Sequence, residues 1–390
     1  MIDPAISTEC CVDAHRTLVF YYASTYPWFV DLMSFAERSL GCEVHYFTHS
    51  LRGTWGAYSE FDLRGIRTTV LPHNERKVNR DFLKPSWALC RLILALLSSD
   101  AAILVDSSLP CTIQVAFLCY ILRTKFVFID AENQRIKSGA RKRLIRKVKT
   151  LLEIFLLKRA TMVVADSASA LDDIYRVAGS LHNLVMIPHG TRLDAFRPRQ
   201  KSQEFLRKHG LRLESQDKVC LYNGGFFAHK GIQYLTEAIL RSPGLGVQFV
   251  LVGYGPDLKQ YAGDLKSADN VTIIPLVPPS EVPDFYSIGD IYILPSIRTE
   301  LDAERSPNTL IEAMASGLAC IATSVGGIPT YAGNATLMIP EKDSGAIVRA
   351  LELLVKDPDL LRRKGRDARE FAESDFDIDR YAQRLCALVA

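Results

Sequence analysis

The sequence of 390 residues lacks several features that would place it in a special class of protein. It has almost no net charge, with 47 basic against 44 acidic residues, so composition predicts no nucleic-acid partner. Its longest apolar runs, such as 115–122, are too short to cross a bilayer. Residues 1–16 lack the apolar core of a signal peptide. We therefore expect a cytoplasmic protein.

The sequence also lacks a recognisable set of metal ligands. Nine cysteines form an odd set whose spacing fits neither a zinc site nor a disulfide framework, which predicts a reducing compartment. There is no cluster of carboxylates of the kind that binds divalent cations. We expect no metal and no tightly bound cofactor.

Short apolar runs alternate with amphipathic stretches, as is typical of parallel sheets covered by helices. Strands are expected at 17–23, 42–47, 101–105, 125–129, 161–165 and 184–187, and again at 219–222, 247–252, 271–274, 291–294 and 319–322. Helices are expected at 85–97, 112–122, 140–157, 346–355, 358–372 and 378–389. The polar segment 197–203 predicts a hinge near residue 200, between two α/β domains.

The most informative stretch of the chain runs from Glu304 to Glu312. The eight-residue separation turns about 800° around a helix at ~100° per residue, so one helix would not align the two carboxylates. We expect Glu304 in a loop, Ser306 as the N-cap, Pro307 at the first helical position and Glu312 on the second turn. The N–H groups of such a helix start attract an anion, and carboxylates accept hydrogen bonds from hydroxyls. A nucleotide sugar matches both requirements.

Three further segments precede this stretch in a fixed order. They are the glycine-containing segment 222–231, the turn at 251–256 and the region from 274 to 296, and the stretch around Glu304 continues to 329. Together the four segments resemble retaining glycosyltransferases of family 4, most clearly over residues 160–390. The resemblance implies the GT-B fold, an α/β architecture of two Rossmann-like domains with parallel sheets facing across a cleft. It implies an acceptor-side domain at 1–198, a nucleotide-sugar donor domain at 199–375 and a final helix at 376–390 that packs back on the first domain.

The resemblance also implies roles for individual residues. Lys230 matches a lysine that holds the donor diphosphate beside the backbone at Gly224 and Gly225, Glu304 the glutamate that binds the sugar hydroxyls, and Glu312 the one that binds the ribose. The backbone of the segment that includes Leu276 and Val277 meets the nucleotide base. The remaining donor-site candidates lie at the start of the helix; they are Arg305, Ser306, Asn308, Thr309 and Leu310.

This chain departs from the family pattern at the phosphate site. Gly225 stands where the family has an arginine, so Arg305 or Arg298 would have to supply the missing charge. The loop after Pro295 is longer than usual, and Glu300 competes with Glu304 for the sugar-binding role. A simple strand, turn and helix with a surface lysine remains the alternative for this region.

The first half offers fewer candidates. The family's glycine-rich loop after the first strand is absent, since the sequence there reads YASTYPW at 22–28. Asp130 and Glu132 follow an expected strand, where relatives place a histidine or acidic pair. Either residue would orient the acceptor hydroxyl, and capping of the next helix is the alternative role.

The segment between Arg135 and Arg159 is strongly basic, with ten lysines or arginines and one acid, Glu153. Lys142, Arg143, Arg146 and Lys149 share a helix face opposite the apolar positions, which fits an anionic membrane surface. A helix packed on the core with a solvated basic face is the alternative.

These features predict a hexosyltransferase that moves a sugar from a nucleotide-sugar co-substrate to an acceptor hydroxyl with retention. The resemblance implies a sugar or lipid-linked acceptor in cell-envelope polysaccharide biosynthesis. Lys230, Glu304 and Asp130 are the catalytic candidates, and peripheral binding to the inner face of the membrane is a further expectation. The alternatives are a nucleotide-sugar epimerase or hydrolase, and an inactive membrane-associated protein with the same fold.

Overall fold

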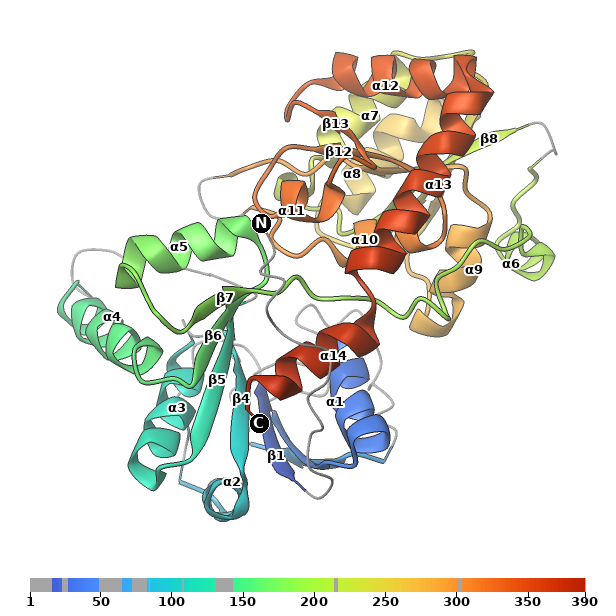
Figure 1. The fold of residues 1–390 in the computed structure, drawn as a ribbon. Helices are drawn as coiled ribbons and strands as arrows, with labels where there is room; N and C mark the ends of the chain where they lie inside the picture. Colours follow the sequence, from blue (N-terminus) through green and yellow to red (C-terminus); the bar gives the residue numbers. More distant parts are fainter. Residues whose placement is uncertain are drawn as a thin grey trace. The chain divides into compact units, whose positions relative to one another are not determined.

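A computed structural model describes residues 16–22, 27–48, 65–71, 83, 85–106, 109–130, 143–213, 217–299 and 303–389. The chain divides into two compact units (Figure 1). Unit 1 contains Met1–Gly190 and Ile378–Ala390, and unit 2 contains Thr191–Asp377.

Unit 1 is built on a seven-stranded sheet in which every strand pair is parallel. Its strands are β1 (Thr17–Tyr22), β2 (Glu43–Thr48), β3 (Arg67–Val70), β4 (Ala101–Val105), β5 (Lys125–Asp130), β6 (Met162–Ala165) and β7 (Leu184–Met186). Their order is β3-β2-β1-β4-β5-β6-β7, which reverses direction between β1 and β4. All five residues of β4 are buried, because a central parallel strand has helices on both faces.

Helices cover both faces of this sheet (Figure 1). They are α1 (Pro27–Leu40), α2 (Trp87–Ser98), α3 (Pro110–Leu122), α4 (Arg143–Leu157), α5 (Ala168–Ala178) and the C-terminal α14 (Ile378–Ala387). Helices α2 to α5 share one core cluster, and α1 and α14 share the other. Ser86 caps α2 and Ser167 caps α5 through their hydroxyls.

Helix α14 is far from the rest of unit 1 in sequence and is part of its core. It packs against α1 and buries Tyr381, Leu385 and Cys386. After the helix, the carbonyl of Val389 accepts a hydrogen bond from Nη1 of Arg16 at 3.0 Å. The last residues of the chain therefore complete the hydrophobic core of unit 1.

Unit 2 is built on a six-stranded sheet, again with parallel pairs throughout. Its strands are β8 (Lys218–Asn223), β9 (Val247–Val252), β10 (Val271–Ile274), β11 (Ile291–Leu294), β12 (Ala319–Thr323) and β13 (Leu337–Ile339), in the order β10-β9-β8-β11-β12-β13. The order reverses between β8 and β11. In doubly wound sheets ligands bind beyond the carboxyl ends of the strands at such a reversal.

The helices of unit 2 pack on both faces of this sheet. They are α6 (Gln203–Lys208), α7 (Ile232–Leu240), α8 (Leu258–Asp264), α9 (Val282–Ser287), α10 (Asn308–Ala315), α11 (Ile328–Ala332), α12 (Ser344–Lys356) and α13 (Pro358–Asp375). Three short 3₁₀ turns complete the unit, η3 (Ala228–Lys230), η4 (Leu265–Ser267) and η5 (Pro279–Glu281). None of the described helices has the length and apolarity needed to span a membrane.

We expect the substitution Leu385→Ala to destabilise unit 1, because Leu385 is fully buried in α14. The loss of a buried leucine side chain lowers the free energy of unfolding by about 2–5 kcal/mol. Chemical denaturation of the full chain measures this change. The control Leu94→Ala removes a leucine that is 60% exposed and should change stability far less. Equal effects of the two substitutions would contradict the packing described for α14.

Candidate functional site

The donor-site residues expected in unit 2 meet where its sheet reverses direction. Lys230 follows β8, and Ser296 and Glu304 follow β11, so all three come from the carboxyl ends of neighbouring strands. Parallel strands direct their following loops to the same edge of the sheet. The topology thus brings together residues that are 74 positions apart in sequence.

The two loops touch through their backbones. Gly231 has a left-handed φ of +66°, and a Cβ at this position would lie 1.8 Å from the carbonyl oxygen of Pro295. The amide of Ile297 donates to the carbonyl of His229 at 2.8 Å. Only glycine permits this approach, which fixes Lys230 against the loop after β11.

Lys230 and Glu304 form an ion pair with a distance of 2.6 Å between Nζ and Oε2. The hydroxyl of Ser296 donates to the same oxygen at 3.0 Å. Burial would raise the pKa of Glu304, yet the charge and hydrogen bond of Lys230, the Ser296 hydroxyl and the charge of His229 together lower it. Glu304 is therefore ionised at neutral pH in this partly buried position.

A pair of glycines holds the backbone of Glu304. A Cβ on Gly326, whose φ is +57°, would lie 1.9 Å from the carbonyl oxygen of Glu304. The amide of Gly327 donates to that oxygen at 2.8 Å. These two glycines therefore position the backbone of the site carboxylate.

The start of α10 differs from the expected one. Glu304 lies in a loop and Glu312 on the second turn of α10, as predicted. The N-cap, however, is Pro307 and not Ser306, because a ψ of 71° keeps Pro307 out of the helix, and no side chain caps α10.

Some of the backbone N–H groups at the start of α10 already donate hydrogen bonds within the chain. Those of Asn308 and Leu310 donate to the carbonyls of Ser306 and Pro307 at 2.9 Å each. These two groups are therefore not the unpaired donors that we expected there. The side chain of Leu310 is fully buried, so only its backbone could contact a ligand.

A group of buried tyrosines surrounds the first turns of α10. The hydroxyl of Tyr286 lies 3.0 Å from Oε2 of Glu312 and 3.1 Å from the carbonyl of Thr309. Asn223 donates to the Tyr286 hydroxyl at 3.3 Å, and Tyr292 bonds Oγ1 of Thr309 at 2.7 Å. Burial, followed by the charge of Glu312, raises the pKa of Tyr286 well above its usual value. Its hydroxyl therefore remains a donor at neutral pH and orients Glu312.

The loop after β8 is packed too tightly for a side chain at its glycines. A Cβ on Gly225 would lie 2.3 Å from the ring of Phe227, which stacks on His229. The space beside Gly225, where the family has an arginine, is thus occupied by an aromatic ring. A Cβ on Gly253 would lie 1.8 Å from the carbonyl oxygen of Gly224, so the turn after β9 packs directly against this loop.

The remaining donor-site candidates are distributed around this centre. Val277 is buried, and Leu276 has a 40% exposed side chain in the loop after β10. The Arg305 side chain is half-buried next to Glu304 in sequence, and the exposed Arg298 donates its backbone amide to Glu341 at 2.7 Å. Glu300 lies outside the described residues, so the choice between Glu300 and Glu304 rests on the contacts of Glu304 alone.

Asp130 ends β5 in unit 1 and is buried. Two further buried aspartates lie at the ends of the neighbouring strands, Asp106 after β4 and Asp166 after β6. Sequence analysis did not single out either one, although Asp106 adopts a left-handed φ of +65° that is unusual for a residue other than glycine. Glu132 lies outside the described residues.

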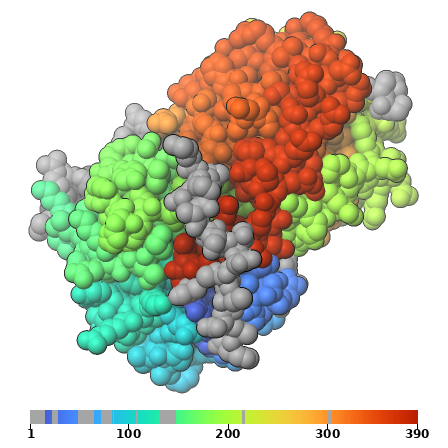
Figure 2. All heavy atoms as spheres, viewed as in Figure 1, coloured from blue at the N-terminus to red at the C-terminus, as the bar shows by residue number. Residues whose placement is uncertain are grey.

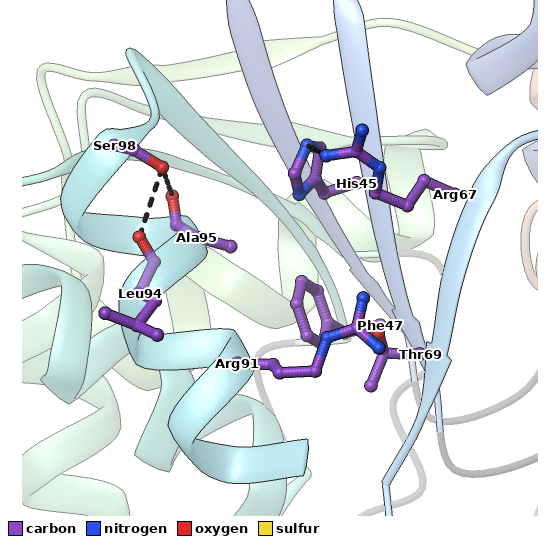
Figure 3. Close-up of a pocket in the computed structure, with 8 residues that line it drawn as sticks. All are labelled: His45, Phe47, Arg67, Thr69, Arg91, Leu94, Ala95 and Ser98. Atoms are coloured by element: carbon purple, nitrogen blue, oxygen red, sulfur yellow. Dashed lines mark hydrogen bonds between the residues drawn. The ribbon is translucent and has the colours of Figure 1, made fainter. Parts of the chain in front are cut away.

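A hollow of about 220 Å³ lies elsewhere in unit 1, between α2 and the strands β2 and β3 (Figure 3). Arg91 reaches over Phe47 and Thr69, and Arg67 runs beside His45 (Figure 3). The lining residues are His45, Phe47, Arg67, Thr69, Arg91, Leu94, Ala95 and Ser98. None of the residues predicted for the donor site or the acceptor site takes part.

The sequence does not reveal the residues that surround the two glutamates. Ser296 contacts Glu304 and Tyr286 contacts Glu312, each through the hydroxyl of an otherwise buried side chain. The half-buried Asn223 contacts Tyr286, and the buried Tyr292 contacts Thr309. In sequence such tyrosines are indistinguishable from core aromatics, because the direction of the hydroxyl depends on tertiary packing.

Comparison with known proteins shows what this chain resembles. Residues 203–371 match the family model for glycosyl transferases group 1. Alpha-D-kanosaminyltransferase of Streptomyces kanamyceticus is 24% identical over 286 residues, which cover 72% of this chain and 70% of that protein. The GPI3 subunit of phosphatidylinositol N-acetylglucosaminyltransferase of Saccharomyces cerevisiae is 28% identical over 195 residues, which cover 48% of this chain and 40% of the relative. The structure of Anabaena HepE in complex with UDP matches with a TM-score of 0.74 at 14% identity, and the match covers 95% of this chain and 98% of that one.

The two all-parallel units have the GT-B α/β fold. Most of unit 2 matches the family model for glycosyl transferases group 1, and the curated relatives are named as glycosyltransferases or their subunits, which supports an enzyme of the transferase type. The alignments span 70%, 55% and 40% of the length of three curated relatives. Donor, acceptor and stereochemistry are therefore matters of proposal.

We expect Lys230→Met to destabilise the protein in a pH-dependent way. The pKa of Glu304 lies below its ordinary value of 4.5, so the ion pair stabilises the fold above that pH. This contribution is lost as the pH falls through the folded-state pKa. Removing the lysine should lower the free energy of unfolding by roughly 2 kcal/mol at neutral pH, somewhat less than the loss of one partner from a fully buried ion pair.

Urea denaturation at pH 7 and pH 3 measures the effect. The difference between wild type and Lys230→Met should shrink at the lower pH, because the protonated carboxyl no longer needs a cation. Lys266→Met, at an exposed lysine in η4, serves as the control. Its difference in stability from wild type should be the same at pH 7 and pH 3. An undiminished Lys230→Met difference at pH 3 would show that the lysine acts through packing and not through charge.

Proposed function

We propose that the protein transfers a sugar from a nucleotide-sugar donor to an acceptor hydroxyl with retention at the anomeric carbon. The observation that carries the proposal is the contact of Lys230, Ser296 and Glu304 at the sheet reversal of a group 1 domain. An ammonium and a carboxylate held side by side suit a ligand that joins an anion to a polyol.

In this proposal Lys230 binds the donor diphosphate. Negative charge accumulates on the leaving diphosphate as the glycosidic bond breaks, and a fixed cation stabilises it. The start of α10 adds the positive end of a helix dipole. Arg305, next to Glu304 in the chain, is the candidate for the second charge that Gly225 does not supply.

Glu304 and Glu312 bind hydroxyl groups of the same ligand. Both Lys230 and Ser296 bond Oε2 of Glu304, and no described residue bonds Oε1. That second oxygen is available to accept from a sugar hydroxyl. Glu312, oriented by Tyr286, accepts from the ribose, and the backbone at Leu276 and Val277 meets the base.

The names and bound ligands of similar proteins suggest which donors and acceptors to test first. HepE has been solved with UDP and with UDP-glucose, which supports uridine nucleotides as the first ligands to test. Relatives are named for teichuronic acid and colanic acid biosynthesis, and one for transfer to phosphatidylinositol. We propose a sugar or lipid-linked acceptor of envelope polysaccharide synthesis, with Asp130 orienting its hydroxyl.

We further propose that the protein is cytoplasmic and binds the inner face of the membrane through residues 135–159.

Alanine substitutions test the donor site. Lys230→Ala and Glu304→Ala should each reduce turnover by roughly 10²–10³-fold, the usual effect of removing a group that stabilises developing charge. Nucleotide release from a panel of nucleotide sugars, with and without acceptor, measures turnover. Glu300→Ala discriminates the two candidate glutamates and should leave turnover near wild type, as should the exposed control Glu237→Ala.

The same panel separates the alternatives. Release that rises with acceptor supports transfer, whereas release or isomerisation without acceptor identifies a hydrolase or epimerase. Thermal stabilisation by none of the UDP, GDP, ADP or CDP conjugates would indicate an inactive protein. Full activity of both Lys230→Ala and Glu304→Ala would refute the site.

The substitution Tyr286→Phe tests how Glu312 is positioned. It removes the hydroxyl that contacts Glu312 and Thr309 and keeps the ring in the core. We expect KM for the donor to rise about tenfold with a smaller change in kcat, since a lost hydrogen bond to a charged group is worth ~1.5–3 kcal/mol. An unchanged KM, with only a lower melting temperature, would assign Tyr286 a purely structural role.

A further inference from the structure

Three consecutive helices of unit 1 carry large apolar side chains on their outer surfaces. These side chains are between 36% and 76% exposed, with Trp87 and Leu151 among the highest. They are Trp87, Leu94 and Leu97 on α2, Phe117, Tyr120 and Ile121 on α3, and Val148, Leu151 and Phe155 on α4. Isolated exposed apolar residues are ordinary, whereas a group spread over neighbouring helices indicates an interaction surface.

These side chains belong to one surface, which we call the three-helix face. The inner sides of α2, α3 and α4 pack into the same core cluster, so their outer sides point away from the same face of the sheet. Helix α3 contacts both α2 and α4, and the rings of Tyr120 and Phe155 meet edge to face at 5.2 Å. Figure 2 shows the atoms of this part of the chain, cyan to green, side by side along unit 1.

The charge of the three-helix face has one sign. Residues 87–98, 110–125 and 147–160 contain seven lysines or arginines and one acid, a formal charge of +6. The acid, Glu153, is buried. The whole chain carries only +3, so the other residues sum to −3. Apolar side chains with surrounding cations are the pattern of a surface that binds anionic lipid.

The hollow shown in Figure 3 lies at the flank of this face. Leu94 and Arg91 of α2 line it, and Leu94 also belongs to the three-helix face. Arg67 contacts Glu43 at 2.9 Å, whereas the exposed Arg91 has no ion pair within the described ranges. The hollow therefore offers an uncompensated guanidinium beside an apolar floor at Phe47, which suits a phosphate group attached to a lipid.

We propose that the three-helix face docks on an anionic phospholipid membrane, with its apolar side chains at the acyl boundary and one phosphate head group in the hollow at Arg91. This surface extends beyond the basic segment 135–159, because it also includes α2 and α3. A second copy of the chain is the wrong occupant, since a symmetric dimer through this face would bring two surfaces of +6 together. The proposal rests on the membrane binding given under the proposed function and not on sugar transfer, because lipid binding is measured without donor or acceptor.

Vesicle flotation with the full chain tests the proposal. Vesicles of phosphatidylcholine alone are compared with vesicles that also contain phosphatidylglycerol, at low and high salt. We expect flotation with the anionic vesicles and partial release by salt. Cys90 lies on α2 and is exposed, so an environment-sensitive dye on it, with Cys10 and Cys11 replaced by serine, should shift to the blue on binding.

Substitutions separate the two parts of the surface. Leu94→Glu with Leu97→Glu should lower partitioning at least tenfold, because two apolar side chains no longer leave water. Arg91→Ala should lower it roughly fivefold, the equivalent of ~1 kcal/mol for one cation at an anionic surface. Leu353→Glu on α12 and Arg363→Ala on α13 are matched exposed controls and should bind as wild type does. Circular dichroism confirms that each variant is folded.

The following outcomes decide against the proposal. Wild type that fails to float with anionic vesicles, or a Leu94→Glu, Leu97→Glu variant that floats normally, overturns it. A concentration-dependent dimer that the same variant abolishes, without vesicle binding, assigns the face to a second copy. Binding of inorganic phosphate at Arg91 without vesicle binding makes the hollow a site for a free anion. Donor turnover is measured on the same variants, so a failure of membrane docking is distinguishable from a failure of the proposed sugar transfer.

Discussion

The ion pair between Lys230 and Glu304 is the interaction on which the site in unit 2 depends. A carboxylate that is largely removed from water is costly unless a cation and hydrogen bonds compensate it, and Lys230 and Ser296 provide both on one oxygen. The pair forms only if the loops after β8 and β11 touch, which requires glycine at position 231. Gly326 fixes the other side of Glu304 in the same way. The charge of Glu304 is therefore compensated only when the backbones of the two loops pack closely, so the two requirements cannot be met separately.

This constraint has a consequence for ligand binding. A diphosphate that draws the Lys230 ammonium toward itself leaves Glu304 with the Ser296 hydroxyl alone, and burial then disfavours the carboxylate. New hydrogen-bond donors must arrive with the anion to offset that loss. A sugar joined to the diphosphate brings hydroxyls at a fixed distance from the phosphates, whereas a free diphosphate brings none. In the proposed function the ion pair thus favours the whole donor over its anionic half.

Much of the fold follows from the sequence, and the exceptions have physical reasons. Central strands such as β4 and β9 are continuous apolar runs, because helices bury both of their faces, and their predicted ends match the structure. The edge strands β3 and β13 were missed, since Arg67–Val70 is polar and Leu337–Ile339 has only three residues. For the candidate site, motif spacing singled out Glu304 and Glu312, and the family resemblance singled out Lys230. Tyr286 and Ser296 escaped notice because their roles depend on the direction of one hydroxyl, and Ser306 was given the cap because a backbone angle at Pro307 has no sequence signature.

The overall composition does not reveal the charge asymmetry of this chain, because the asymmetry also depends on tertiary packing. A formal charge of +3 on 390 residues predicts weak attraction to any polyanion. The parallel topology places α2, α3 and α4 on one face of the unit 1 sheet, and their basic residues then add, with Glu153 as the one acid among these helices. The field near a surface depends on the nearest charges, because salt screens those beyond about 8–10 Å. A nearly neutral protein can therefore present a strongly cationic face, and the apolar side chains among those cations would hold it at an interface after electrostatic attraction has brought it there.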